Sequence, residues 1–371
     1  MKILQKLSTL IAREAYDSDW VLPLSQRLSE FFTAASRNWI PAIGRDAGIE
    51  EMRAKIHAFG CFRNPEAWIQ GPQCTLQDWP LFVEASHSFD PYTAIWLKEG
   101  WATRLIDRHL RANSEFPCLS ISGAQSETLS ASRLTLHTGA GMSFAKFTLS
   151  KWAATAQMPA LGSVIDEFIE RSGERALPNY RRCVVEPLGL VVRTLHPHLM
   201  APISRLLSAR SDEECASFWH GSGRGLYFDP IHFVPFVPMR RWSLDEAVSS
   251  APGACARANL LSGFFWAMTL VNIQHPEVVI GFLGSMPVEH WRQDASAVAD
   301  GVSAAILVWH HLTGDHAVAE HFFEHVPSRA PETLRRLWED QIVSLARRRL
   351  ADDYQKLRQE DRIADIFRFR G

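Results

Sequence analysis

The sequence lacks an excess of either charge and has no long hydrophobic run. Lysine and arginine number 39 and aspartate and glutamate number 41, so the formal net charge is −2. Binding to nucleic acid or to an anionic membrane needs a basic excess, so we expect neither as a partner. The longest apolar stretch, residues 260–273, is interrupted by polar residues and is too short to span a bilayer.

Clustered cysteines and targeting signals are missing as well. No two of the six cysteines are closer than 13 positions, which excludes a C-x-x-C pair and a zinc ribbon and favours scattered thiols. Residues 1–13 alternate charged and apolar side chains and lack the continuous apolar core of a signal peptide. We therefore expect a soluble, cytoplasmic protein.

The fingerprints of several enzyme classes are absent. There is no G-x-S-x-G, Walker A, H-E-x-x-H or dinucleotide-binding pattern. The glycine-rich run 221–225 follows no predicted strand and precedes no Lys-Ser/Thr pair, so we do not expect a phosphate loop. The sequence leaves the identity of any cofactor unknown.

The overall composition is that of an ordinary globular protein, with a large number of tryptophans. The chain has 371 residues, 46% hydrophobic and 22% charged, and about 150 residues per domain predicts two domains or one extended one. The 13 tryptophans are interpreted first as core packing. The alternative is an apolar groove for a bulky ligand or partner.

A short pattern recurs along the chain: a polar residue, then small residues, then an apolar run. The polar residues are spaced 39, 48, 34, 42 and 38 positions apart, and they are Glu99, Thr138, Glu186, His220, Ser262 and Asp300. Such spacings are typical of stacked helical hairpins. Glycine costs about 1 kcal/mol inside a helix, so a glycine in each copy indicates close backbone approach between helices. Chance recurrence of small residues is the alternative.

The sequence therefore predicts an all-α protein in three parts. Residues 1–87 form an N-terminal helical cap, residues 88–326 a curved, solenoid-like array of helical hairpins, and residues 327–371 a C-terminal charged helix. Within the cap we expect helices over 24–34 and 49–57. An apolar stripe predicts that the last helix docks on the array, with a partner-binding arm as the alternative; the stripe is Leu334, Leu337, Ile342 and Leu345.

Equivalent positions of stacked repeats line up on one face. Glu99, Glu186, His220 and Asp300 would then share an inner surface, where they could bind a metal or act as acid and base. We favour the alternative that they are buried hydrogen-bond partners of closely packed helices. A second and weaker metal candidate is the pair His321 and His325, four positions apart, which we expect at the surface.

His220 and Arg224 also lie four positions apart, so they project from one side of a helix. The planar guanidinium suits a carboxylate, and Glu186 in the preceding copy is the expected partner of Arg224. The candidate ligand-binding residues are His137, His220, Arg224, Trp101, Trp219 and Trp266.

Three segments carry a resemblance to known sequences: DPYTAIWLKEG at 90–100, HTGAGMSFA at 137–145 and FWHGSGRGLYF at 218–228. They resemble an uncharacterised bacterial helical-repeat family, distantly similar to the domain of unknown function found in enediyne natural-product gene clusters. In that domain comparable segments have Glu where this chain has Thr138, and Gln where it has His220. The resemblance implies a setting in natural-product metabolism but no established activity.

Together these observations predict an accessory or binding protein with an apolar, tryptophan-rich groove for a small molecule or a protein partner. The rival hypothesis is an enzyme that uses the acidic and histidine residues of the repeat, with or without a metal. The oligomeric state does not follow from the sequence.

Overall fold

The computed structural model describes residues 45–69, 75–121, 126–154, 160–229, 237–328 and 330–369. In these ranges the regular elements are helices and there is no strand, which confirms the all-α prediction. The expected helix 49–57 lies within the first described helix, whereas the expected helix 24–34 lies outside the described residues. The main helices are α3 (Arg45–Arg63), α4 (Trp79–Ser86), α5 (Pro91–Asn113), α6 (Glu127–Ala154), α7 (Leu161–Arg175), α8 (Arg181–Leu195), α9 (Met200–Arg210), α10 (Asp212–Tyr227), α11 (Val237–Ser249), α12 (Ala254–Val271), α13 (Pro276–Gly284), α14 (Val288–Thr313) and α15 (His316–Glu324).

The boundaries of the central helices follow from local signals. Asp90 caps α5, because its side chain accepts a hydrogen bond from the Thr93 N–H at 3.0 Å. Ser211 caps α10 in the same way. Gly314, with a φ of 66°, ends α14 in the left-handed conformation that favours glycine.

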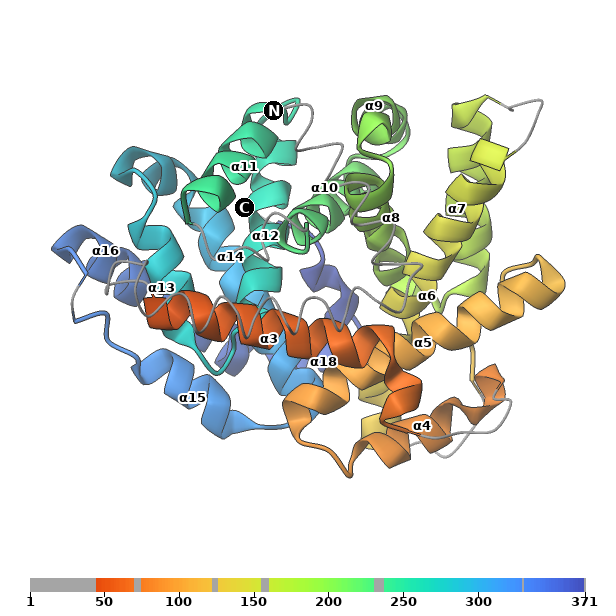
Figure 1. Ribbon diagram of the computed structural model, residues 1–371, viewed down its shortest axis with the longest axis horizontal. Coiled ribbons are helices and arrows are strands. Elements are labelled where there is room, and N and C mark those ends of the chain that lie inside the picture. Colours follow the sequence, from red (N-terminus) through yellow and green to blue (C-terminus); the bar gives the residue numbers. More distant parts are fainter. Residues whose placement is uncertain are drawn as a thin grey trace.

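The six helices that carry the recurring pattern pack in chain order, each against the next: α5, α6, α8, α10, α12 and α14. Figure 1 shows this succession from right to left, with α3 crossing in front of it. Because α14 also contacts α5 and α6, the two ends of the succession meet. The division of the chain at residues 87 and 327 stays a prediction. The main hydrophobic core includes residues from Ala58 to Phe367, and a smaller cluster lies around Trp79, Phe82 and Trp101.

Glycines lie where these helices cross. The carbonyl oxygen of Val184 lies 2.5 Å from the point that a Cβ on Gly141 would occupy. At Gly263 the corresponding distance, to the carbonyl oxygen of His220, is 1.9 Å. Any side chain at these positions would force the helices apart, so the predicted close approach of backbones is confirmed.

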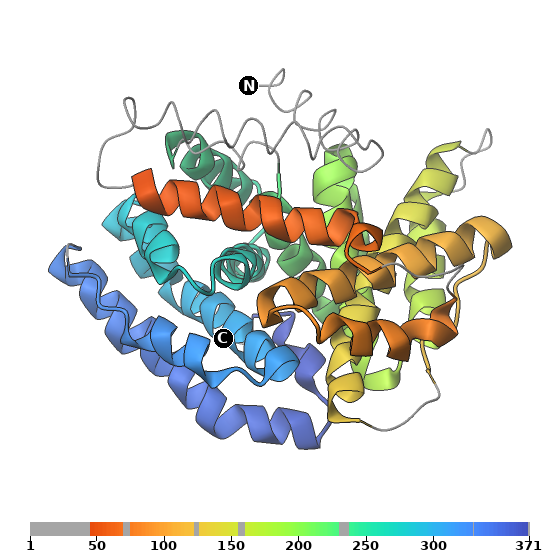
Figure 2. The same cartoon turned by 60° about the horizontal axis from the view of Figure 1, so that its bottom comes forward.

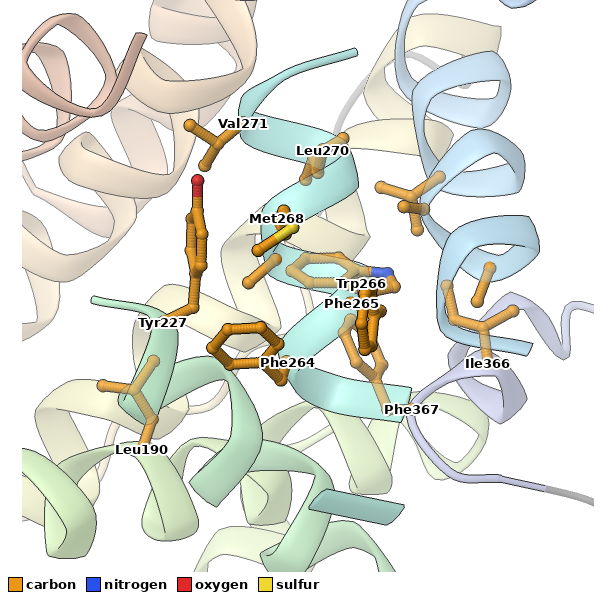
Figure 3. Packing of buried hydrophobic residues seen from close by; sticks show 14 of the residues in the cluster. Leu190, Tyr227, Phe264, Phe265, Trp266, Met268, Leu270, Val271, Ile366 and Phe367 are labelled. Atoms are coloured by element: carbon orange, nitrogen blue, oxygen red, sulfur yellow. The ribbon is translucent and has the colours of Figure 1, made fainter. Parts of the chain in front are cut away.

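Helix α12 lies at the centre of the core. It is apolar and long enough to span a membrane by composition, but 78% of that stretch is buried inside the protein, as expected of a core helix. Figure 3 shows Phe264, Phe265 and Trp266 projecting from α12 among side chains of neighbouring elements, including Tyr227 of α10 and Phe367. This burial is compatible with the predicted absence of a membrane span.

After α15 the chain forms one long helical run that packs on α14 and follows one edge of the molecule (Figure 2). Leu334, Leu337 and Ile342 of the expected stripe are buried and Leu345 is half-buried, so the stripe docks as predicted. The run alternates α and π geometry and ends in a 3₁₀ turn: α16 (Glu332–Arg336), η6 (Leu337–Val343, π), α17 (Ser344–Arg348), η7 (Arg349–Asp353, π), α18 (Tyr354–Gln359) and η8 (Ile363–Ile366, 3₁₀).

Candidate functional site

Four ionisable side chains from three helices meet in the core. Glu186 of α8 accepts a hydrogen bond from Arg224 Nη1 at 2.7 Å and lies 2.9 Å from His220 Nδ1, both on α10. Arg224 Nη2 donates to Glu99 Oε1 of α5 at 3.3 Å. All four side chains are buried. The predicted pairing of Arg224 with Glu186 is confirmed, and three of the four proposed acid–base residues lie together.

The two carboxyl groups of this cluster differ in their electrostatics. Burial raises the pKa of Glu99, and the nearby Arg224 charge opposes that rise without cancelling it. Burial also acts to raise the pKa of Glu186, but the Arg224 charge and the hydrogen bond from His220 outweigh it, so the pKa of Glu186 is lowered. Glu186 is therefore ionised at neutral pH. An ionised carboxylate only accepts hydrogen bonds, so Nδ1 of His220 carries a proton and donates.

Three polar atoms beside the cluster have no hydrogen-bond partner among the described residues: Nε2 of His220, Nε of Arg224 and Nε1 of Trp266. The Arg224 guanidinium carbon lies 4.6 Å from the centre of the Trp266 ring. Phe367 is a neighbour of all three residues. Its ring centre lies 5.8 Å from that of His220, 5.6 Å from that of Trp266 and 5.9 Å from the Arg224 guanidinium carbon.

Asp300, the fourth proposed acid–base residue, has different partners. Its Oδ2 accepts a hydrogen bond from Ser262 Oγ at 2.7 Å, and its Oδ1 lies 2.6 Å from Arg349 Nη2. Asp300 therefore ties α14 to α12 and to the C-terminal run, apart from the Glu186–His220 pair.

His137 is buried, and both of its ring nitrogens have partners. Nδ1 donates to the carbonyl oxygen of Arg133 at 2.7 Å, and Nε2 accepts from the Leu177 N–H at 3.2 Å. Burial lowers the pKa of His137 to about 4, which keeps the ring neutral. These contacts connect α6 to the segment before α8.

The three candidate tryptophans do not share one groove. Trp101 is buried against Phe82, with the two ring centres 4.1 Å apart. Trp219 donates from Nε1 to Ser204 Oγ at 2.9 Å, and Trp266 packs on Arg224 as described above.

His321 and His325 do not share a helix face. α15 ends at Glu324, and the backbone of His325 is extended, with its carbonyl oxygen accepting from Trp338 Nε1 at 3.0 Å. His321 is exposed. Within the described residues, no group of three or more histidine, cysteine or acidic side chains is arranged to hold a metal ion.

A cavity of about 460 Å³ lies between the end of α8 and helices α9, α10 and α11. Arg193 lines it and donates from Nε to Ser222 Oγ at 3.0 Å, whereas its Nη2 is buried and has no partner in the described part of the chain. Burial lowers the pKa of Arg193 to about 10, against the opposing charges of Asp229 and Glu246, so the guanidinium stays protonated at neutral pH. The apolar wall is formed by Pro197, Met200, Ala201, Trp219, Leu226, Trp242, Ala247 and Pro252.

Of the residues that line this cavity, Trp219 alone was a candidate from the sequence. Arg193 could have been found, because it is the one charged residue in the apolar stretch 188–195. Trp242 has no comparable signal. Comparison of the chain with family models, with curated proteins and with solved structures gave no match.

Proposed function

We propose that this chain is a binding protein for a small, largely apolar organic molecule, and that its site is the cavity between α9, α10 and α11. The observation that carries the proposal is the pair of tryptophans, Trp219 and Trp242, in the wall of a cavity of about 460 Å³. Ligand pockets usually enclose roughly 300–1,000 Å³ and combine aromatic walls with a few polar groups.

Arg193 defines the polar end of the expected ligand. A buried donor without a partner costs about 1–3 kcal/mol, so a ligand oxygen that accepts from Nη2 recovers that free energy. Asp229 and Glu246 act on the pKa of Arg193 as opposing charges. A neutral carbonyl group therefore suits the site better than an anion, and we propose an aromatic ketone or a similar compound as the ligand class.

The probe for this proposal is 6-propionyl-2-(dimethylamino)naphthalene, a neutral aromatic ketone whose emission shifts to shorter wavelength in apolar surroundings. We expect saturable binding at one site per chain. Ala201→Trp places a ring at the rim of the cavity and should abolish binding, because Ala201 is exposed and lines the cavity. Arg193→Met keeps the apolar volume and should weaken binding about tenfold, the loss of one hydrogen bond.

The matched control is Trp68→Ala. Trp68 is 41% exposed and does not line this cavity, so its replacement should leave the titration unchanged. Absence of a saturable blue shift in the wild-type protein, or equal binding by wild type and Ala201→Trp, would contradict the proposal.

We also infer that the central helices form an array of helical hairpins, as the spacing of the pattern predicts. The alternation along the chain of long helices α8, α10, α12 and α14 with α9, α11 and α13 supports this interpretation. The interpretation requires that the pairs α8–α9, α10–α11 and α12–α13 superpose on one another. A cytoplasmic location and a setting in natural-product metabolism stay predictions from the sequence.

A further inference from the structure

The unpartnered atoms of the buried cluster indicate a second site. Nε2 of His220, Nε of Arg224 and Nε1 of Trp266 lie in the core without partners among the described residues, and the apolar ring of Phe367 is a neighbour of all three side chains. Buried polar atoms in native proteins are nearly always hydrogen-bonded, so three exceptions around one ring need an explanation.

We infer that His220, Arg224 and Trp266 form a closed binding site for a neutral aromatic alcohol, and that Phe367 occupies the place of its ring in this structure. Figure 3 shows Phe367 beside Trp266, with Ile366 next to it in the chain. The segment 363–369 is then a plug that the ligand displaces.

The chemistry of the three atoms selects a hydroxyl group. Nε of Arg224 and Nε1 of Trp266 carry hydrogens and can only donate. With Nδ1 of His220 donating to Glu186, the tautomer protonated at Nδ1 has its lone pair on Nε2, which can accept. A hydroxyl oxygen accepts from the first two atoms while its hydrogen is donated to the third. A hydrocarbon satisfies none of them.

The charges of the cluster exclude an anion. Arg224 is the single guanidinium of the cluster and already faces two carboxyl groups, Glu186 and Glu99. A ligand carboxylate would bring a third acidic group to the same cation in a buried setting, where unpaired charge is costly. The ligand must therefore be neutral.

The plug contains the short 3₁₀ turn η8, and its polar contacts can be broken without unfolding an α-helix. The Phe369 N–H donates to Asn259 Oδ1 at 2.7 Å, Arg368 Nη1 donates to Glu213 Oε1 at 2.8 Å, and Asp365 pairs with Arg182. The Glu213 side chain is 54% exposed and the Arg368 side chain 25%, so water can replace that ion pair at little cost. Burial of Phe367, together with that of Ile363, Ala364 and Ile366, holds the plug closed, and a ligand ring that takes the place of Phe367 replaces the contribution of that side chain.

The test compares three probes of similar shape on the full chain carrying Phe367→Ala: phenol, toluene and benzoate, titrated by calorimetry. We expect phenol to bind at least about tenfold more tightly than toluene, and benzoate to bind more weakly than phenol. Adding His220→Ala removes one of the three proposed hydrogen bonds and should reduce the preference for phenol. The control is Phe322→Ala, which opens a fully buried space beside Trp338 and should prefer toluene.

A second measurement uses the wild-type chain and does not depend on the folding of a variant. Saturating phenol should accelerate amide hydrogen exchange in residues 363–369, and toluene should not. Unchanged exchange with phenol, or toluene binding to Phe367→Ala as tightly as phenol, overturns the inference and leaves the cluster as a structural element only.

Discussion

Gly189 of α8 and Gly221 of α10 each lie against the backbone of the other's helix. The carbonyl oxygen of Phe218 is 1.8 Å from the point that a Cβ on Gly189 would occupy, and that of Glu186 is 1.9 Å from the equivalent point on Gly221. Each carbonyl belongs to the residue three positions before the opposite glycine, so the contact is reciprocal. This approach places the Glu186 side chain within hydrogen-bond distance of α10.

Replacing a crossing glycine should destabilise the protein strongly. Gly221→Ala puts a methyl group onto a backbone carbonyl that cannot move alone, and we expect a loss of about 3 kcal/mol or more in the free energy of unfolding. Urea titration measures it. The control is Gly281→Ala in α13, where nothing lies within 4 Å of the new Cβ. There we expect a gain of about 0.5–1 kcal/mol from helix propensity. Equal stability of the two variants would contradict the close crossing.

Removing Arg224 should expose the cost of a buried unpaired carboxylate. Arg224→Ala leaves the buried carboxyl group of Glu186 without its cationic partner, and we expect a loss of about 3–5 kcal/mol in the free energy of unfolding. The double variant Glu186→Gln with Arg224→Met carries no charge at either position and should recover most of that loss. Melting temperatures within about 1 °C of wild type for both Arg224→Ala and His220→Ala would contradict a structural role of the cluster.

His137 should make the protein less stable in mild acid. Burial lowers its pKa from 6.5 to about 4, so the unfolded chain binds a proton that the folded chain does not. Stability is therefore complete above pH 6.5 and falls as the pH decreases toward 4, by on the order of 3 kcal/mol in full. His137→Gln should show a smaller loss between pH 7.5 and 5 in urea titrations, while His311, whose pKa burial also lowers to about 4, retains part of it. Replacing the exposed His321 with Gln should leave the wild-type slope, and an unchanged slope in His137→Gln would refute the assignment.

The buried ammonium group of Lys98 should lower the free energy of unfolding at neutral pH. Its side chain is buried, and burial lowers its pKa from 10.5 to about 8, so the folded state bears the cost of a desolvated ammonium group at pH 7. The free energy of unfolding should rise as the pH increases from 8 to 10.5. Lys98→Met should raise stability at pH 7 by up to about 3 kcal/mol and remove that rise. Lys356→Met, at an exposed position of α18, should change neither quantity, and a destabilised Lys98→Met would contradict this prediction.

The helices and their crossings could be predicted from the sequence because both depend on local pattern. Gly263 and Gly301 follow polar residues within apolar helical stretches, and the backbone of the preceding pattern-bearing helix contacts each of them. The pairing of Arg224 with Glu186 could also be predicted. His220 and Arg224 lie four positions apart on one helix, and Glu186 belongs to the preceding copy of the pattern.

Contacts between segments far apart in the chain could not be predicted from local sequence pattern. His137 accepts from the Leu177 backbone, and Asp300 pairs with Arg349, because of how the helices are oriented in space. The polar residues of the recurring pattern, which were expected to share one inner surface, therefore belong to separate groups of contacts. Phe367 reaches the centre of the core from a segment whose sequence has no helical periodicity, so nothing local indicated its position.

The π-helical stretches η6 and η7 set how the C-terminal run can change over evolutionary time. A π turn accommodates about one residue more than an α turn, and one residue rotates everything after it by about 100° around the helix axis. Tyr354 and Leu357 are buried after two such turns. Exposed residues such as Glu339 and Asp352 can be exchanged freely, but the loss of one residue would turn the following buried face to solvent. Insertions and deletions are therefore more tightly restricted in this run than substitutions.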